Sequence, residues 1–220
     1  MNIAALRTLI QRAQQQEAQQ PRLADQLSAS IDALHPAIRL TGADTAGVLG
    51  RFVHAYIEQV PDMLDAANQV AREAGIELQI KPVLKVAEEF FLHPPPVMAG
   101  HEGLDCLLDE AYLAHRLVEE VNDRYIAHLG QPLIPLDTTV ANLIAHQLIG
   151  ETFANQLDEA VQQALDGLLD SETFDQASVH AYRERLNDPT VEAAWKRWPC
   201  LSRQLGVELE LQQADIQSAV

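Results

Sequence analysis

Residues 104–129 read LDCLLDEAYLAHRLVEEVNDRYIAHL, and this stretch decides the fold. At about 100° of rotation per residue, its apolar side chains fall on one arc of a helix. That arc consists of Leu104, Leu107, Ala111, Ala114, Leu117, Val118, Val121, Tyr125 and Leu129. The opposite face is charged and is expected to be solvated; it holds Asp105, Asp109, Arg116, Glu119, Glu120 and Asp123. The pattern predicts a long amphipathic helix over about residues 102–129.

A second helical pattern covers about residues 138–169 and has apolar side chains on both sides in its first half. The loop between the two patterns contains Gly130, Pro132 and Pro135, which favour a break in the helix. A short connection makes two long helices antiparallel neighbours. The sequence therefore predicts an all-α fold, an antiparallel helical bundle around these two long central helices.

Shorter elements are expected around this pair. A glutamine-rich helix over residues 3–20 ends at Pro21, and a capping signal at Thr41 and Asp44 starts a helix over about 43–74. Pro61 falls inside that helix and should kink it or divide it in two. A further helix is expected from about residue 83 to residue 92, and three shorter helical pieces are expected near residues 172–186, 189–198 and 200–204.

Two segments alternate apolar and polar residues, as strands do: IELQI at 76–80 and VELEL at 207–211. One interpretation is a minor two-stranded ribbon formed by the two segments; the other is that either segment is the end of a helix. The expected organisation is an N-terminal helical arm at 1–35, a helical bundle core at 41–204 and a C-terminal tail at 205–220.

The net charge of the chain limits the kinds of partner that it can bind. The 220 residues carry a formal net charge of −17, with only three lysines. Such a surface repels the phosphates of nucleic acids and anionic lipids, so we expect neither nucleic acid nor a membrane as partner. A protein partner or a small ligand suits the chain better, in particular a basic protein, a cationic ligand or a metal ion.

The cysteines and the longest apolar run indicate a cytoplasmic protein. Cys106 and Cys200 are too few and too far apart for a disulfide framework, which fits a reducing compartment. Cys106 has no cationic neighbour in the sequence, so we expect an unreactive thiol. The uncharged stretch 138–150 is too short to cross a bilayer, and the polar N-terminus does not resemble a signal peptide.

Four ionisable residues lie on faces that otherwise read as core, and they are the candidate ligand- or metal-binding residues: Glu110, His115, His146 and Glu151. A buried ionisable group is costly unless a partner satisfies it, so these residues either pair with one another or hold a ligand. Pairing of Glu110 on one central helix with His146 on the other is the simpler hypothesis. No catalytic residue is assigned.

A metal-binding site formed by these residues is the more specific hypothesis. Inward-pointing carboxylates and histidines are how di-iron and di-manganese helical bundles hold their ions, so the unknown cofactor would be a metal ion. Those bundles use Glu-x-x-His, and this chain contains no such motif. Glu110 and His115 are five residues apart, as are His146 and Glu151, and this spacing separates the two side chains by about 140° around a helix.

A pocket is expected where the proline-rich segment 93–101 meets the central helices. Pro94, Pro95 and Pro96 force an extended, stiff connector. The candidate pocket-lining residues are His93, His101, Tyr112 and His128.

No phosphate loop, no nucleophile elbow and no His-Glu-x-x-His motif is present. The expected function is therefore a non-enzymatic ligand-binding or protein-interaction module. Two alternatives stay open: a metal-dependent helical-bundle oxidase, and an acidic inhibitor or immunity-type protein that neutralises a basic partner.

Overall fold

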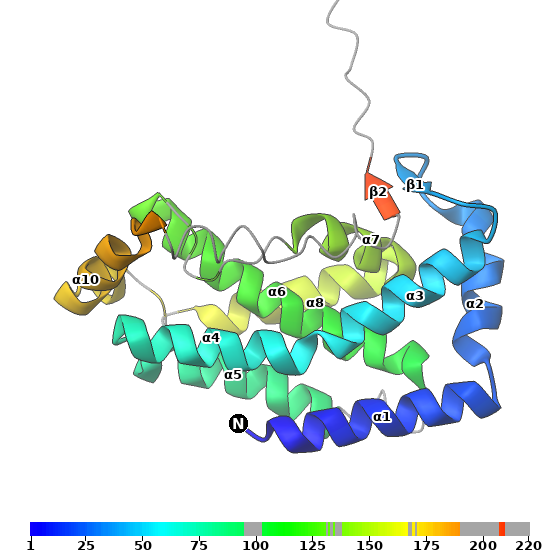
Figure 1. The fold of residues 1–220 in the computed structure, drawn as a ribbon, viewed down its shortest axis with the longest axis horizontal. Coiled ribbons are helices and arrows are strands. Elements are labelled where there is room, and N and C mark those ends of the chain that lie inside the picture. The colour runs from blue at the N-terminus through cyan, green and yellow to red at the C-terminus, as the bar shows by residue number, and fades with distance from the viewer. Residues whose placement is uncertain are drawn as a thin grey trace, which may run out of the picture.

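The structure is a computed structural model of the chain, and Figure 1 shows its arrangement of helices. The described residues are 1–94, 103–130, 132, 134, 138–166, 169, 171–189 and 207–209. Their helices are α1 (Ile3–Gln19), α2 (Arg22–Ser30), the short 3-10 helix η1 (Ile31–Ala33), α3 (Thr45–Glu58), α4 (Val60–Ala74), α5 (Glu77–Leu92), α6 (Leu104–Leu129), α7 (Thr139–Ile149), α8 (Glu151–Leu165), α9 (Ser171–Phe174) and α10 (Ala177–Leu186). The two strands are β1 (Ile38–Leu40) and β2 (Val207–Leu209). The all-α fold class predicted from the sequence is confirmed.

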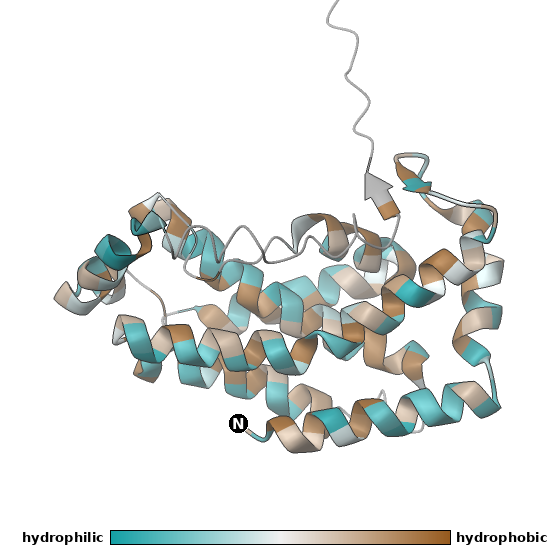
Figure 2. Ribbon diagram, viewed as in Figure 1, coloured by the Kyte–Doolittle hydropathy of each residue, from teal (hydrophilic) through white to brown (hydrophobic). Residues whose placement is uncertain are grey.

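The long helix α6 is the centre of the bundle. It packs against α1, α3, α4, α5, α7 and α8, so it meets neighbours on most of its circumference. Its apolar arc is buried as predicted, from Leu104 at one end to Leu129 at the other. Gly130 ends the helix in the left-handed conformation with φ 77°, which a residue without a Cβ adopts at no steric cost. Figure 2 shows hydrophobic residues recurring along the helices between hydrophilic ones, as amphipathic helices require.

The prediction of one continuous helix over residues 138–169 is wrong, because this segment forms two helices, α7 and α8. Gly150 has φ 97° and ψ 138°. This conformation lies outside the helical region and interrupts the helix between α7 and α8. The amide N–H of Gly150 still caps α7 by donating to the carbonyl of His146, and the Gly150 carbonyl accepts from the amide of Ala154. One glycine therefore ends α7 and starts α8 in a new direction. Periodicity beyond residue 150 no longer refers to the same axis.

The predicted division at Pro61 is confirmed. α3 ends at Glu58 and α4 begins at Val60, so that Pro61 stands in the first turn of α4, where its missing N–H removes no helical hydrogen bond. Asp44 caps α3, because its side chain accepts a hydrogen bond from the amide of Gly47. The N-terminal helix also forms, and Leu6 and Ile10 of α1 are buried in the same core as α6. The proposed domain limits stay a prediction.

The predicted ribbon between 76–80 and 207–211 is wrong. Residues 77–80 begin helix α5, and β2 pairs antiparallel with β1, with Arg39 opposite Glu208. The alternating sequence is compatible with a helix because Ile76 and Ile80 are four residues apart and share its buried face, whereas Leu78 points outward and is 85% exposed. Helix α5 thus begins six residues before the predicted start at residue 83.

Two other expectations fall partly or wholly outside the described residues. The stiff connector at 93–101 is described only at His93 and Pro94, and the helical pieces expected at 189–198 and 200–204 lie outside apart from Pro189. Within the described parts, none of the helices is both long and apolar enough to cross a membrane.

Candidate functional site

A pocket of about 300 Å³ lies between α6, α7 and α8, and we call it the α6–α8 pocket. Its lining residues are Tyr112, Arg116, Glu119, Thr139, Asn142, Leu143, His146 and Asp158. The change of direction at Gly150 creates it, because α7 and α8 then approach α6 from different angles. Most of the lining side chains are polar, although they come from helices that bury their apolar faces in the core.

Arg116 holds two carboxylates at the base of this pocket. Its Nε donates to Asp158 Oδ1 at 2.8 Å, and its Nη1 donates to Glu119 Oε2. The Tyr112 hydroxyl donates to both oxygens of Asp158, at 3.0 and 3.1 Å. Asp158 thereby accepts from two donors, the shared Tyr112 hydroxyl and Arg116 Nε, and α6 is joined to α8 through charged groups as well as through apolar packing.

Asn142 of α7 continues the network into the core. Its amide nitrogen donates to Glu119 Oε2 at 2.6 Å, and its Oδ1 accepts the Tyr56 hydroxyl at 2.6 Å. Asn142 and Tyr56 are both buried. The network therefore joins α3, α6, α7 and α8, and its outer end faces the pocket. Buried polar groups that are satisfied in this way fix the relative positions of the elements that supply them.

The field in the pocket is negative, because two carboxylates face one guanidinium. Burial raises the pKa of Tyr112 above its ordinary value, and the charges of Asp158 and Glu119 raise it further against the opposing effect of Arg116. Burial by itself would lower the pKa of Arg116, yet its hydrogen bonds to Asp158 and Glu119 raise that pKa. Arg116 therefore stays charged, and one negative charge remains in excess.

Comparison of the chain with known proteins gives no match to a protein-family model, to a curated protein or to a solved structure. The chemistry of the site is therefore inferred from its geometry alone.

The four candidate residues predicted from the sequence do not come together. Among the described residues, no group of three histidine, cysteine, aspartate or glutamate side chains is placed to hold a metal ion. Glu110 and His146 form no hydrogen bond or ion pair with each other: Glu110 Oε2 is buried without a partner, and His146 Nε2 pairs with Asn155 Oδ1 at 3.1 Å. The predicted Glu110–His146 pair is therefore wrong. Metal binding by this chain stays a prediction.

His115 and Glu110 are both buried, as predicted, but in separate surroundings. The His115 ring stacks on the Tyr56 ring at 4.0 Å between centroids, and its Nε2 donates to the Tyr56 carbonyl at 2.9 Å. Burial lowers the pKa of His115 to about 4. Burial also raises the pKa of Glu110 to about 8, and nearby Asp109 and Asp105 add to this. At neutral pH both side chains are uncharged, which makes their burial tolerable.

The other predicted residues have varied positions. Tyr112 and His146 line the α6–α8 pocket, with their rings edge to face at 6.0 Å. Glu151 is exposed in the first turn of α8 and lies off any apolar face, because the break at Gly150 changed the helix axis. His93 is exposed and bonded to Glu89, and His128 is exposed with its ring near that of Phe174. His101 lies outside the described residues.

The expected inertness of Cys106 agrees with its surroundings. Burial raises the pKa of the thiol to about 12, and the neighbouring charge of Asp105 acts in the same direction. The sulfur therefore stays protonated at neutral pH and is a poor nucleophile.

The sequence prediction missed six of the eight residues that line the pocket. Arg116 and Glu119 were expected on a solvated face, but α7 and α8 cover that face and leave both side chains largely buried. One signal was present: Asn142 is a polar residue in an apolar stretch, and a buried amide requires polar partners. That requirement points to a polar face on a neighbouring helix, and α6 supplies it.

Proposed function

We propose that this protein is a non-enzymatic ligand-binding protein that takes a small organic cation, an amine or a guanidinium compound, in the α6–α8 pocket. The observation that carries the proposal is the state of Glu119. Its Oε2 accepts from Arg116 and from Asn142, whereas its Oε1 has no hydrogen-bond partner among the described residues. An ionised carboxylate accepts on both oxygens, so Oε1 is a free acceptor beside the pocket.

The excess negative charge supports a cation as the ligand. A carboxylate that bonds to an ammonium or guanidinium group makes a charge-assisted hydrogen bond, which is about twice as strong as a neutral one. The net charge of −17 attracts cations to the protein from a distance as well. An anion would meet Glu119 and Asp158, whose charges Arg116 only partly compensates.

The size and the rim of the pocket favour a small molecule with a short apolar body. A volume of about 300 Å³ lies at the lower end of the range for small-molecule sites. Leu143 lies at the pocket with half of its surface exposed, and the Tyr112 ring forms part of the wall. These two side chains offer contacts to methylene groups, while Glu119 offers the polar contact.

Calorimetric titration with agmatine, putrescine and spermidine tests the proposal, with 1,4-butanediol as a neutral analogue of putrescine. We expect binding of at least one of the three cations and none of the diol. The substitution Glu119→Gln keeps the size of the side chain and removes its charge, so it should weaken binding about tenfold.

Glu151→Gln is the matched control, because it removes the same charge from an exposed position outside the pocket. It should leave the affinity within about twofold, since exposed charges interact weakly through water. The folded state of each variant is checked by circular dichroism. Absence of binding by all three cations contradicts the proposal, and so does equal affinity of Glu119→Gln and the unchanged protein.

A further inference from the structure

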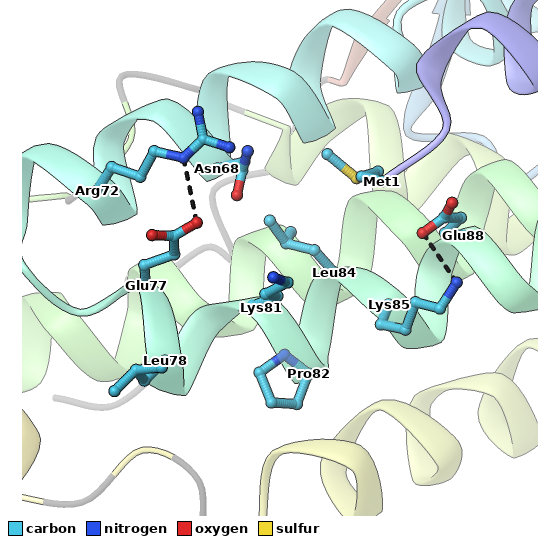
Figure 3. A pocket seen from close by; sticks show the side chains of 10 residues that line it. All are labelled: Met1, Asn68, Arg72, Glu77, Leu78, Lys81, Pro82, Leu84, Lys85 and Glu88. Carbon is cyan, nitrogen blue, oxygen red and sulfur yellow. Dashed lines mark hydrogen bonds and ion pairs between the residues drawn. The ribbon is translucent and has the colours of Figure 1, made fainter.

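A second hollow, of about 420 Å³, lies between α4 and α5, and we call it the α4–α5 groove. Its lining residues are Met1, Asn68, Arg72, Glu77, Leu78, Lys81, Pro82, Leu84, Lys85 and Glu88. Figure 3 shows them in two rows, with Asn68 and Arg72 on α4 facing a longer row on α5 and Met1 near one end. The groove shares no lining residue with the α6–α8 pocket.

The turn at Gly75 brings the two walls together. Gly75 has φ 75°, and the amide of Ile76 donates to the carbonyl of Ala71, so α4 ends in a tight reversal and α5 returns alongside it. Pro82 lies inside α5 and has no N–H to donate. The carbonyl of Leu78, a lining residue, therefore lacks its usual helical hydrogen bond from residue 82.

Two of the three cationic side chains in the groove are already paired. Arg72 Nε donates to Glu77 Oε1 at 3.1 Å at one end, and Lys85 Nζ binds Glu88 at 3.2 Å at the other. Lys81 stands between these pairs on α5 and has no hydrogen-bond or ion-pair partner among the described residues. The side chains of the lining therefore carry one positive charge in excess, and that charge is at Lys81.

This positive charge is unusual for the chain. Only three lysines are present in a protein of net charge −17, and two of the three, Lys81 and Lys85, line this one groove. Apolar surface lies directly beside them. Leu78 is 85% exposed and Met1 is 42% exposed, and Pro82 and Leu84 complete the apolar part of the lining. The Lys81 ammonium next to these apolar walls matches a ligand with a negative charge and an apolar body.

We propose that the α4–α5 groove binds a small monocarboxylate with an unbranched alkyl chain. Its carboxylate lies on the Lys81 ammonium, and its chain lies against Leu78, Pro82 and Leu84. The flanking carboxylates of Glu77 and Glu88 select a monoanion, because a dianion such as a phosphate ester would be repelled from both sides. The two paired cations hold those carboxylates in place without contributing a further unpaired charge.

Calorimetric titration with octanoate tests this proposal. Acetate carries the same charge without the chain, octanol carries the chain without the charge, and octyl phosphate carries the chain with a second charge. We expect octanoate to bind more tightly than all three. Lys81→Gln should weaken octanoate binding about tenfold, since it removes the one cationic side chain of the groove that has no partner among the described residues. Leu78→Ser should weaken it about fivefold through the lost apolar contact, and the exposure of Leu78 keeps the fold intact.

Arg12→Gln is the matched control, because it removes one positive charge from an exposed position on α1 outside the groove. It should leave the octanoate affinity unchanged within about twofold. Three results overturn the proposal: no binding of octanoate, octanol binding as tightly as octanoate, or equal losses in Lys81→Gln and Arg12→Gln. Tighter binding of octyl phosphate than of octanoate also overturns it, because the flanking carboxylates then do not select a monoanion.

Discussion

The polar side chains of α6 and those of the α4–α5 groove are of the same chemical types, but they differ in how much water reaches them. Arg116 is 20% exposed and its partner Glu119 is 11% exposed, whereas Arg72 and Glu77 are 60% and 40% exposed. The salt bridge on α6 sits within a network that spans four helices, and the one in the groove joins two neighbouring elements at the surface.

The difference teaches that burial, more than the identity of the residues, decides what a charge contributes. A largely buried ion pair has lost its hydration, so removing one partner leaves the other uncompensated. An exposed pair exchanges its partner for water at little cost. We therefore expect substitutions on α6 to change the stability of the fold, and those in the groove to change mainly the binding of ligands.

The largest effect is expected from Arg116→Met. The substitution leaves Glu119 and Asp158 facing each other without their common cation, and it should lower the free energy of unfolding by about 3 kcal/mol. Urea denaturation at pH 7 followed by circular dichroism measures the loss. Adding Glu119→Gln and Asp158→Asn to the same chain should restore part of the stability, because the repelling charges are then gone. A loss below about 1 kcal/mol would show that the network stabilises the fold no more than an exposed ion pair does.

The pH dependence of stability gives the next effect. The pKa of Glu110 is about 8 in the folded protein, compared with 4.5 ordinarily, so between these values the folded chain binds more protons than the unfolded chain. Stability therefore falls as the pH rises through this range, by up to about 1.4 kcal/mol per pH unit. His115 has the opposite sign: its pKa is about 4 in the folded protein and 6.5 ordinarily, so its effect raises stability between pH 4 and pH 6.5.

The two effects oppose each other below pH 6.5, and Glu110 acts alone above it. We expect stability to fall by about 2 kcal/mol between pH 6.5 and pH 8, measured by urea denaturation at a series of pH values. Glu110→Gln should remove this fall, and His115→Gln should retain it. A profile that is the same in the unchanged protein and in Glu110→Gln would show that the carboxyl group titrates normally.

A smaller change in stability is expected from removing a buried tyrosine hydroxyl, and its size should depend on whether that hydroxyl makes a hydrogen bond. Tyr56→Phe removes the hydrogen bond to Asn142 Oδ1 and leaves that buried oxygen without a donor, at a cost of about 1.5 kcal/mol. Tyr125→Phe is the matched control, because the Tyr125 hydroxyl is buried and has no hydrogen-bond partner in the described part of the chain. It should be neutral or stabilising. Equal losses in thermal unfolding would show that the Asn142 bond contributes nothing specific.

Much of the fold was predictable because local signals fix it. The apolar arc of residues 104–129 gave α6 and its buried face, and Pro61 marked the division between α3 and α4. The break at Gly150 was not predictable from periodicity, because a glycine within an apolar run also allows a continuous helix. The alternation at 76–80 misled for a related reason, since Ile76 and Ile80 are spaced for a strand and for a helix alike.

The candidate site was harder to predict than the fold. Hydrophobic patterning within one helix shows which face is apolar, but the burial of a polar face depends on the neighbours that cover it. Arg116 and Glu119 read as solvated until α7 and α8 are placed over them. Tyr112, a predicted pocket residue, and His146, a predicted ligand residue, both line the α6–α8 pocket, but this pocket is not the one expected beside residues 93–101. Glu151 was assigned to the wrong face because its helix has a separate axis.

The smallest effect is expected from Arg72→Gln, which breaks the exposed pair with Glu77 in the α4–α5 groove. The free energy of unfolding should change by less than about 0.5 kcal/mol, because both charges keep most of their hydration. The small difference should also shrink when salt is raised, since screening affects exposed pairs most. Urea denaturation at low and high ionic strength, next to Arg116→Met under the same conditions, measures both points. A loss in Arg72→Gln that approaches that of Arg116→Met, or that persists in high salt, would mean that exposure does not separate the two regions. The charges of the groove would then stabilise the fold, and they could not be altered for binding studies without disturbing the helices that carry them.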